Sequence, residues 1–589
     1  MMMAESVKGS AKDKAVLAVD LGSLNTRALL FEIIDGRYQF IRAGSSPSTL
    51  NAPHLDLNEG VYQSLVNLQR LSGRTVLDED SRLINPQNDA GQGIDKLVLT
   101  CSAGSEIRVV LIGLVRNLDI ASAGNALRHE RTTIVETIGL DDDRSLDRQV
   151  DAIINAAPDL ILLTGGAENG AMRSVARQAE LVVLVCRLMP EDKRPLVIYA
   201  GNSRLAQKTA ETLQRWTRVF IATNLRPTPD NETLESVVEA LTDAVIDIRM
   251  RQLPGLQPLA GASHGSLLSS PHAYGRIIRY LSKINDPAKS VVGISIGASS
   301  TTLAVSGQVD LFLRVFPCGT GSFKALLDEK DSLQSIYRWL AVDVSMDDLR
   351  DYLYQKLAYP GLVPMHDEAL AIEQSLSRHL LQNLSQDLTR DDITCKRPCD
   401  PVIVSGRSLT QSTDISATML TLLNGLQPCG ITSFLFDSND IIPSLGAIAQ
   451  VNSILPVQVI ENGLMPASGP VICPVSYAKL GSDIATISLE YKDARKLQFS
   501  IKQGTIIRLP VQNGQSVRMK IETIGKTVID PFVKRKQVEH NLTGGLFGII
   551  VDARPRPLKI SNIPSERIEQ LKAWKDALIT PVAATERKD

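Results

Sequence analysis

The chain of 589 residues contains one pattern twice: an apolar run, a short polar turn with glycine, and a second apolar run. The first copy spans residues 16–30 and the second spans residues 291–305. Apolar runs of this length around a polar turn are typical of two paired strands. The two copies stand about one domain length apart, so two such turns can hold one ligand from opposite sides. Converging backbone donors are well suited to phosphate groups, which makes a nucleotide the first hypothesis.

The first turn carries the residue types that a phosphate site uses. Gly22 lets the backbone turn where a side chain would clash, and Ser23, Thr26 and the neighbouring amides can donate to phosphate oxygens. Asp20, at the end of the first strand, can hold a magnesium ion through the water ligands of the metal. An ordinary hairpin with a polar turn explains these residues equally well. Both interpretations stay open at this point.

The second turn has the same character. Its candidate nucleotide-binding residues are Gly297, Ala298, Ser299, Ser300 and Thr301. The nearby glycines at 319 and 321 are predicted to continue this surface.

A further candidate lies at the end of a buried apolar run, residues 158–164, where Gly165 and Gly166 follow. Ligands of parallel sheets commonly bind where strands end and glycine loops begin, so both glycines are predicted to bind nucleotide. A tight turn before the next helix is an equally good explanation. Strand, glycine turn and helix units repeat up to residue 251 and predict an α/β sheet.

Composition narrows the classes of partner. Lys and Arg number 63 against 65 for Asp and Glu, which gives no basic excess for binding nucleic acid. No apolar run is long enough to cross a bilayer, and the polar start, residues 1–14, is predicted to be a disordered tail. Seven scattered cysteines without an export signal indicate reduced thiols and a cytoplasmic protein.

The last part of the chain has a different pattern. Residues 487–491, 505–509 and 517–521 largely alternate apolar with polar side chains, which predicts half-buried antiparallel strands. We expect a small β-sandwich or barrel in residues 460–589. A helix is predicted after Pro564, and its apolar face is expected to pack on this β domain rather than on a partner.

Seven short motifs, found in order between residues ~15 and ~455, resemble those of the glutamate mutase L family (MutL or GlmL). This family belongs to the superfamily that includes actin, sugar kinases and heat-shock chaperone ATPases. The matching residues are Asp20 to Ser23 with Thr26 and Arg27, Cys101 to Ala103, Pro158 to Leu163 with Gly165 and Gly166, Ala200 to Asn202, Ile294 to Thr301, Leu426 to Thr432 apart from Cys429, and Pro443 to Ala447.

The resemblance implies an α/β fold of two RNase H-like domains with ATP in the cleft between them. With it come the domain boundaries 15–260 and 261–459, followed by the β domain. It also implies ATP and Mg²⁺ as cofactors, Asp20 as the catalytic and metal-directed carboxylate, and Arg27 and Gly406 in the nucleotide site.

The sequence departs from the family pattern at two places. Ser295 stands where the second phosphate loop of the superfamily normally begins with aspartate, and Thr302 stands where the family usually has another acidic residue. The double glycine of the adenosine turn is reduced to Gly406, and Arg407 can either crowd a base or stack on it. Phosphoryl transfer depends on neutralising charge around the phosphates, so these changes weaken the case for hydrolysis more than the case for binding.

The resulting prediction is a glutamate mutase L-like accessory protein, a nucleotide-binding chaperone or reactivating factor of a cobalamin-dependent mutase. Its expected ligands are ATP or ADP, and its expected partners are the mutase subunits. The alternative is a non-hydrolysing scaffold that kept the actin-like fold, which Ser295 favours. A small-molecule kinase is a weaker third option because the sequence shows no convincing general base.

Overall fold

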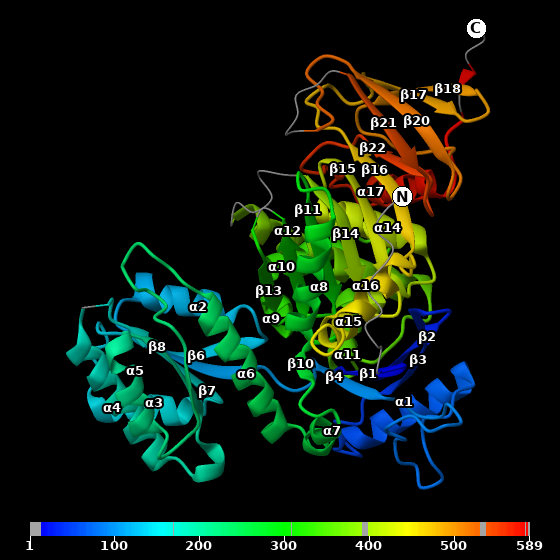
Figure 1. Cartoon of the computed structure of the whole chain (residues 1–589). Coiled ribbons are helices and arrows are strands. Elements are labelled where there is room, and N and C mark those ends of the chain that lie inside the picture. The colour runs from blue at the N-terminus through cyan, green and yellow to red at the C-terminus, as the bar shows by residue number, and fades with distance from the viewer. Residues whose placement is uncertain are drawn as a thin grey trace. The chain divides into compact units, whose positions relative to one another are not determined.

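The computed structural model describes residues 13–168, 170–307, 309–390, 398–530, 537–583 and 585–586 (Figure 1). The chain forms two compact units. Unit 1 comprises Met1–Tyr274, Leu313–Pro317 and Pro443–Val459, and unit 2 comprises Gly275–Phe312, Cys318–Ile442 and Ile460–Asp589. The predicted domain boundaries at residues 260 and 459 stay predictions. The predicted N-terminal tail lies almost wholly outside the described residues.

The first sheet of unit 1 has the strand order β10-β4-β1-β2-β3. β1 pairs antiparallel with β2 and parallel with β4, β2 pairs antiparallel with β3, and β4 pairs parallel with β10. Helices α1 and α7 contribute to the core on this sheet. The bounds are β1 (Ala15–Leu21), β2 (Asn25–Ile34), β3 (Arg37–Pro47), α1 (Leu57–Ser72), β4 (Lys96–Cys101), α7 (Leu256–Ala262) and β10 (Leu267–Ser269).

A second sheet in unit 1 is entirely parallel and has the order β6-β5-β7-β8-β9. Both faces are covered, which explains why these strands read as unbroken apolar runs. Its elements are β5 (Ile107–Ile112), η1 (Arg116–Ile120), α2 (Ala121–Leu127), β6 (Thr132–Ile138), α3 (Leu146–Ala156), β7 (Leu160–Gly165), α4 (Met172–Leu188), η2 (Glu191–Lys193), β8 (Leu196–Gly201), α5 (Ser203–Leu213), β9 (Val219–Ile221) and α6 (Glu235–Gln252).

Residues 97–104 and 108–115 are two largely apolar stretches that follow each other closely in the sequence. The structure places them in different sheets, β4 in the first and β5 in the second. Gly104, with φ of +102°, lies between them. A side chain at this position would meet the guanidinium of Arg249, 2.4 Å from its Nη1 atom.

The third sheet has eight strands in the order β13-β12-β11-β14-β15-β16-β22-β19. Its first five strands repeat the order of the first sheet, with β11 antiparallel to β12 and parallel to β14, and β14 parallel to β15. The bounds are β11 (Ser290–Ile296), β12 (Thr301–Ser306), β13 (Phe312–Phe316), β14 (Cys399–Ser405), β15 (Gly430–Asp437), β16 (Ala467–Cys473), β19 (Ile506–Leu509) and β22 (Ile549–Asp552).

Helices of the second half include two in the segment 331–357, which carries apolar residues at helical spacing. These two helices are α10 and α11, with a break between them. The bounds are α8 (Ser270–Ile284), α9 (Lys324–Asp328), α10 (Lys330–Tyr337), α11 (Met346–Ala358), α12 (Asp367–Arg390), α13 (Arg407–Thr410), α14 (Ile415–Leu426), α15 (Ile442–Ile448) and α16 (Ile454–Glu461). No helix of the described residues combines the length and the apolar character needed to cross a membrane.

The C-terminal region adds a mostly antiparallel sheet of order β21-β20-β17-β18-β23, as the alternating pattern predicted. Only part of the C-terminal region forms this separate sheet, because its strands β16, β19 and β22 belong to the eight-stranded sheet. Helix α17 packs against β19 and α14. The bounds are β17 (Asp483–Tyr491), β18 (Lys496–Lys502), β20 (Ser516–Thr523), β21 (Gln537–Thr543), α17 (Pro564–Ile579) and β23 (Thr585–Glu586).

Candidate functional site

The carboxylate of Asp20 lies near the carboxyl end of β1, in the middle of the first sheet. Its Oδ1 atom accepts hydrogen bonds from the hydroxyls of Thr100 (2.7 Å) and Ser270 (3.2 Å). Its Oδ2 atom lies 3.5 Å from Nη1 of Arg27, the residue directly opposite on β2. Asp20 is 6% exposed. The structure therefore brings together two of the predicted residues, Asp20 and Arg27, and fixes the orientation of the carboxylate.

The first glycine turn is tight. The N–H of Gly22 donates to the carbonyl of Asn25 at 3.0 Å, and a Cβ atom at residue 22 would lie 2.7 Å from that carbonyl oxygen. The hydroxyl of Ser23 donates to the carbonyl of Ser102, on the loop after β4. Thr26 differs from the prediction, because its side chain is fully buried beside Gly60 of α1 and does not line the turn. Its hydroxyl is thus placed for packing, not for binding a phosphate.

The loop after β4 supports this turn. The N–H groups of Ser102 and Ala103 both donate to the carbonyl of Leu21, at 2.9 and 3.0 Å. Cys101 precedes them, and burial raises the pKa of its thiol to about 11. A thiol in this state is a packing residue rather than a nucleophile.

The second predicted turn has the same backbone closure as the first. The N–H of Gly297 donates to the carbonyl of Ser300 at 2.9 Å. Thr320 and Gly321 donate their N–H groups to the carbonyls of Gly297 (3.0 Å) and Ala298 (2.8 Å). The 319–321 segment therefore contacts the second turn within unit 2, and its share in a nucleotide-binding surface stays a prediction. The hydroxyl of Thr301 is turned away, donating to the carbonyl of Cys318 at 2.7 Å.

Strand register shows that Ser295 occupies the position of Asp20 in the repeated fold. Asp20 is the last residue but one of β1 and lies opposite Arg27 on β2. Ser295 is the last residue but one of β11 and lies opposite Thr302 on β12. One carboxylate and one guanidinium in the first sheet thus correspond to two hydroxyls in the third sheet.

Gly406 follows β14, where the family's adenosine turn was expected. Its φ is +99°, and a Cβ atom there would lie 2.2 Å from the carbonyl oxygen of Ile296, so only glycine fits. Arg407 begins the short helix α13, and its side chain is exposed with Nε donating to Gln411 at 3.1 Å.

Two buried carboxylates next to this turn were missed in the sequence. Asp437 accepts hydrogen bonds from the Ser405 hydroxyl (3.2 Å) and the backbone N–H of Ile441 (2.9 Å), and burial together with the nearby charge of Asp440 raises its pKa. Asp440 accepts the N–H of Gly406 at 2.7 Å. Aspartates at the end of an apolar strand are the signal that could have found them. Asp440 thus fixes the turn at Gly406, while Asp437 joins Ser405 to the backbone that leads into α15.

Gly165 and Gly166 lie in the parallel sheet, not in the sheet that carries Asp20. Both have positive φ, at the carboxyl end of β7. Glu168, which follows them, accepts hydrogen bonds from Ser203 (3.1 Å from its N–H) and from the side-chain amide of Asn224 (2.7 Å). These contacts join the ends of three adjacent strands. They hold the loops of this sheet together, and they do not connect Gly165 or Gly166 to the turn at Gly22.

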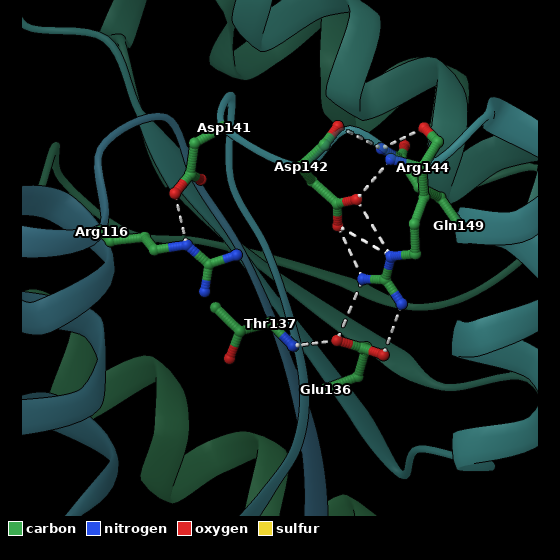
Figure 2. Close-up of polar contacts among 7 residues, drawn as sticks. All are labelled: Arg116, Glu136, Thr137, Asp141, Asp142, Arg144 and Gln149. Carbon is green, nitrogen blue, oxygen red and sulfur yellow. Dashed lines mark hydrogen bonds and ion pairs between the residues drawn. The ribbon is translucent and has the colours of Figure 1, made fainter.

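A cavity of about 590 Å³, which the sequence did not predict, lies at the β6 edge of the parallel sheet. Figure 2 shows the polar contacts among charged side chains that line it. Arg144 donates to Glu136 at 3.0 and 3.2 Å and to Asp142 at 2.6 Å, while Arg116 donates to Asp141 at 2.6 Å. The hydrogen bonds from Arg144 lower the pKa of Asp142 to about 2. The lining contains four carboxylates and two guanidinium groups, so it is unfavourable for a phosphate.

The donor set of the first turn suits a nucleotide with a hydrated magnesium ion. Mg²⁺ keeps several water ligands and needs only one or two carboxylates besides phosphate oxygens. Asp20 is one such carboxylate, already oriented by two hydroxyls. The described residues contain no group of three or more Asp, Glu, His or Cys side chains arranged to hold a metal by themselves. A metal here would therefore depend on the phosphates for its remaining ligands.

The first sheet and the first five strands of the third sheet share the same strand order. Each has a glycine turn between its first two strands in the sequence, and this arrangement defines the actin-like ATPase class of α/β fold. The model of the MutL protein family matches residues 16–312, half of the chain, and the chain belongs to this family. Protein MutL of Clostridium tetanomorphum is 22% identical over 273 residues, which cover 45% of this chain and 56% of that protein. The chain thus spans about half the length of this relative. The predicted family and fold class are confirmed.

Solved structures with a detectable likeness include two kinases and a Ppx/GppA protein. Xylulose kinase from Bifidobacterium adolescentis is 12% identical, with 76% of this chain and 93% of that chain covered and a TM-score of 0.27. Acetate kinase from Porphyromonas gingivalis is 10% identical, with 74% and 100% covered and a TM-score of 0.26. The Aquifex aeolicus Ppx/GppA family member is 10% identical, with 68% of each chain covered and a TM-score of 0.17. At such scores the fold assignment rests on strand order alone.

Proposed function

We propose that this chain binds ATP or ADP and acts as an accessory protein of a cobalamin-dependent mutase, as a chaperone or reactivating factor. The observation that carries nucleotide binding is the Asp20 carboxylate, held by Thr100 and Ser270 beside the tight turn at Gly22. The mutase partner comes from the resemblance to glutamate mutase L and from membership of the MutL family.

Several residues have distinct roles in this proposal. The backbone N–H groups and the Ser23 hydroxyl of the first turn would donate to phosphate oxygens. Arg27 would add a positive charge at the same strand end. Asp20 would hold a magnesium ion through water, and that ion would neutralise part of the phosphate charge. The second turn, at Gly297 to Ser300, would supply further backbone donors.

Ser295 favours binding over turnover. Its position corresponds to that of Asp20, but it offers a hydroxyl in place of a charge. Hydrolysis needs metal-directed charge on the phosphates more than binding does. The second candidate function is therefore a scaffold that does not hydrolyse nucleotide. Such a scaffold either binds nucleotide without turnover or has kept only the fold.

Calorimetric titration of the full chain with ATP and Mg²⁺, together with a phosphate-release assay, tests the first part. We expect Asp20→Ala to weaken ATP binding about tenfold, equivalent to ~1.4 kcal/mol, and an exposed-site control, Asp347→Ala, to leave it unchanged. No binding by the wild-type chain would leave only the scaffold. If binding without phosphate release is found, Ser295→Asp should raise turnover, and no rise would contradict the role given to Ser295.

The partner is tested separately with purified mutase subunits from the same host. Size-exclusion chromatography of the mixture should show a complex whose amount differs between ATP and ADP. A mixture that never forms a complex, with either nucleotide, would contradict the accessory role without affecting nucleotide binding.

A further inference from the structure

A segment of unit 2 between α11 and α12 exposes its large apolar side chains. Tyr359 is 71% exposed, Val363 56%, Met365 87% and Leu362 39%. Tyr354, in the last turns of α11, is 51% exposed. Single exposed apolar residues are ordinary on protein surfaces, but five within twelve residues are a group. We call residues 359–365 the apolar loop.

The apolar loop is held in place by a buried ion pair. Lys356 of α11 donates to Glu373 of α12 at 2.6 Å and to the carbonyl of Leu362 within the loop. The hydroxyl of Tyr352 donates to the same carboxylate at 2.9 Å. The side chains of Lys356 and Glu373 are only 5% and 12% exposed. These bonds join both helices to the loop, so its outward side chains are presented in a fixed arrangement that lowers the entropic cost of binding.

The charges that flank the apolar loop are acidic. Residues 343–368 contain six acidic residues and two basic ones, of which Lys356 is taken up by the buried pair. Asp347, Asp351 and Tyr354 are exposed and follow an i, i+4, i+7 spacing, which places them on one face of α11. An anionic lipid surface would be repelled by such a rim. A protein surface with apolar side chains between lysines and arginines would be complementary to the apolar loop in hydrophobicity and to its acidic rim in charge.

We propose that the apolar loop, with the exposed face of α11, is a docking surface for a partner protein whose contact region combines an apolar centre with a basic rim. Tyr359 and Met365 are the anchors, since they expose the largest fractions. The inference goes beyond the proposed function, because it requires neither nucleotide binding nor any particular mutase.

The test uses the full chain and a defined probe: a fluorescein-labelled amphipathic helix with leucine on one face and lysine on the other. Anisotropy gives its affinity for the wild-type chain, for Tyr359→Ser/Met365→Ser, and for Tyr477→Ser/Leu480→Ser. The last pair is the matched control, because it removes two side chains that are 89% and 72% exposed elsewhere in unit 2. Binding should weaken about tenfold in the first double variant, equivalent to ~1.4 kcal/mol, and stay unchanged in the control.

A second variant tests the rim without touching the apolar side chains. Asp351→Asn/Asp367→Asn should weaken binding at low salt, and the difference should shrink at high salt. Equal losses in both apolar double variants, or no loss in either, would overturn the proposal. Two further results with the wild-type chain would also overturn it, if Tyr359→Ser/Met365→Ser abolishes them. Self-association in sedimentation velocity would show that the surface binds a second copy of the chain. Binding to phosphatidylserine vesicles would show that the surface binds a lipid membrane.

Discussion

Pro360 of the apolar loop packs directly against Gly321. A Cβ atom on residue 321 would lie 2.6 Å from Cβ of Pro360, closer than real atoms approach. The N–H of Gly321 donates to the carbonyl of Ala298 at 2.8 Å, within the second glycine turn. Gly321 therefore contacts both the second glycine turn, which is a candidate phosphate site, and the proposed docking surface of unit 2.

Gly321→Ala should disturb both sides of this contact. The added methyl forces Pro360 or the 319–321 backbone to shift, and overpacking of this kind costs about 1–3 kcal/mol of the free energy of unfolding. We expect a lower melting temperature and weaker ATP binding, measured by calorimetry. Gly361→Ala is the matched control, because a Cβ atom there would meet no atom within 4 Å. Equal behaviour of the two variants would contradict the contact.

A second prediction concerns Asp552, at the end of β22. Its carboxylate accepts from Arg554 at 2.7 and 2.8 Å and from Arg556 at 2.9 Å, and the side chains of Asp552 and Arg554 are fully buried. The guanidinium of Arg554 also lies 4.5 Å from the ring centre of Trp574 on α17. Asp552→Ala leaves two cations without their carboxylate, and we expect a loss of about 3–5 kcal/mol. Denaturation followed by tryptophan fluorescence measures it.

Asp310→Ala is the comparison for Asp552. Asp310 also has two cationic partners, Arg279 at 2.6 Å and Lys283 at 3.1 Å, but its side chain is 55% exposed. We expect a loss of no more than about 1 kcal/mol, because exposed ion pairs are weak. If both variants lose the same amount, burial does not explain the role of Asp552.

A third prediction concerns pH. Burial raises the pKa of Glu130 to about 7, although Ser269 donates to its carboxylate. A carboxyl whose pKa is raised in the folded state stabilises the fold below its ordinary pKa, and this stabilisation is lost as pH rises towards 7. In the wild-type chain, Glu130 should therefore lower the free energy of unfolding by on the order of 2 kcal/mol as pH rises from 4.5 to 7.5. In Glu130→Gln this decrease should be absent. Urea denaturation across this range measures it.

Glu136→Gln should have the opposite sign. The hydrogen bonds from Arg144 lower the pKa of Glu136, so its contribution is present at neutral pH and is lost as pH falls. The variant should lose stability at pH 7 and little at pH 3. Parallel pH profiles for the two glutamine variants would contradict both assignments.

The sequence predicted the elements whose signal is local. The two glycine turns follow from apolar runs around Gly22 and Gly297, and α17 follows from Pro564 and the apolar face after it. What it could not predict depends on pairing between distant strands: that β5 leaves the sheet of β4, or that β19 joins the sheet of β14. The cavity at Arg144 was missed for the same reason, since residues on β6 and on the loops after β5 and β6 create it together.

A last prediction concerns a buried cation that forms no salt bridge with a carboxylate of the described residues. Arg378 of α12 is 3% exposed, its guanidinium lies 3.9 Å from the ring centre of Trp339, and its hydrogen bond to Gln382 is 2.7 Å long. Its Nε and Nη1 atoms have no hydrogen-bond partner among the described residues, and burial lowers its pKa to about 9. Replacing a buried charge that lacks an ionic partner with an apolar side chain of similar length removes a desolvation cost.

We therefore expect Arg378→Met to raise the free energy of unfolding by about 1–2 kcal/mol, measured by urea denaturation at pH 7 with Trp339 fluorescence as one probe. Arg350→Met on α11 is the control, because Arg350 is exposed and pairs with the exposed Asp347, so its loss should change stability by no more than about 0.5 kcal/mol. A loss of stability in Arg378→Met would mean that the stacking on Trp339 outweighs the cost of burying the charge. An unchanged value in both variants would mean that the guanidinium is solvated in the folded protein.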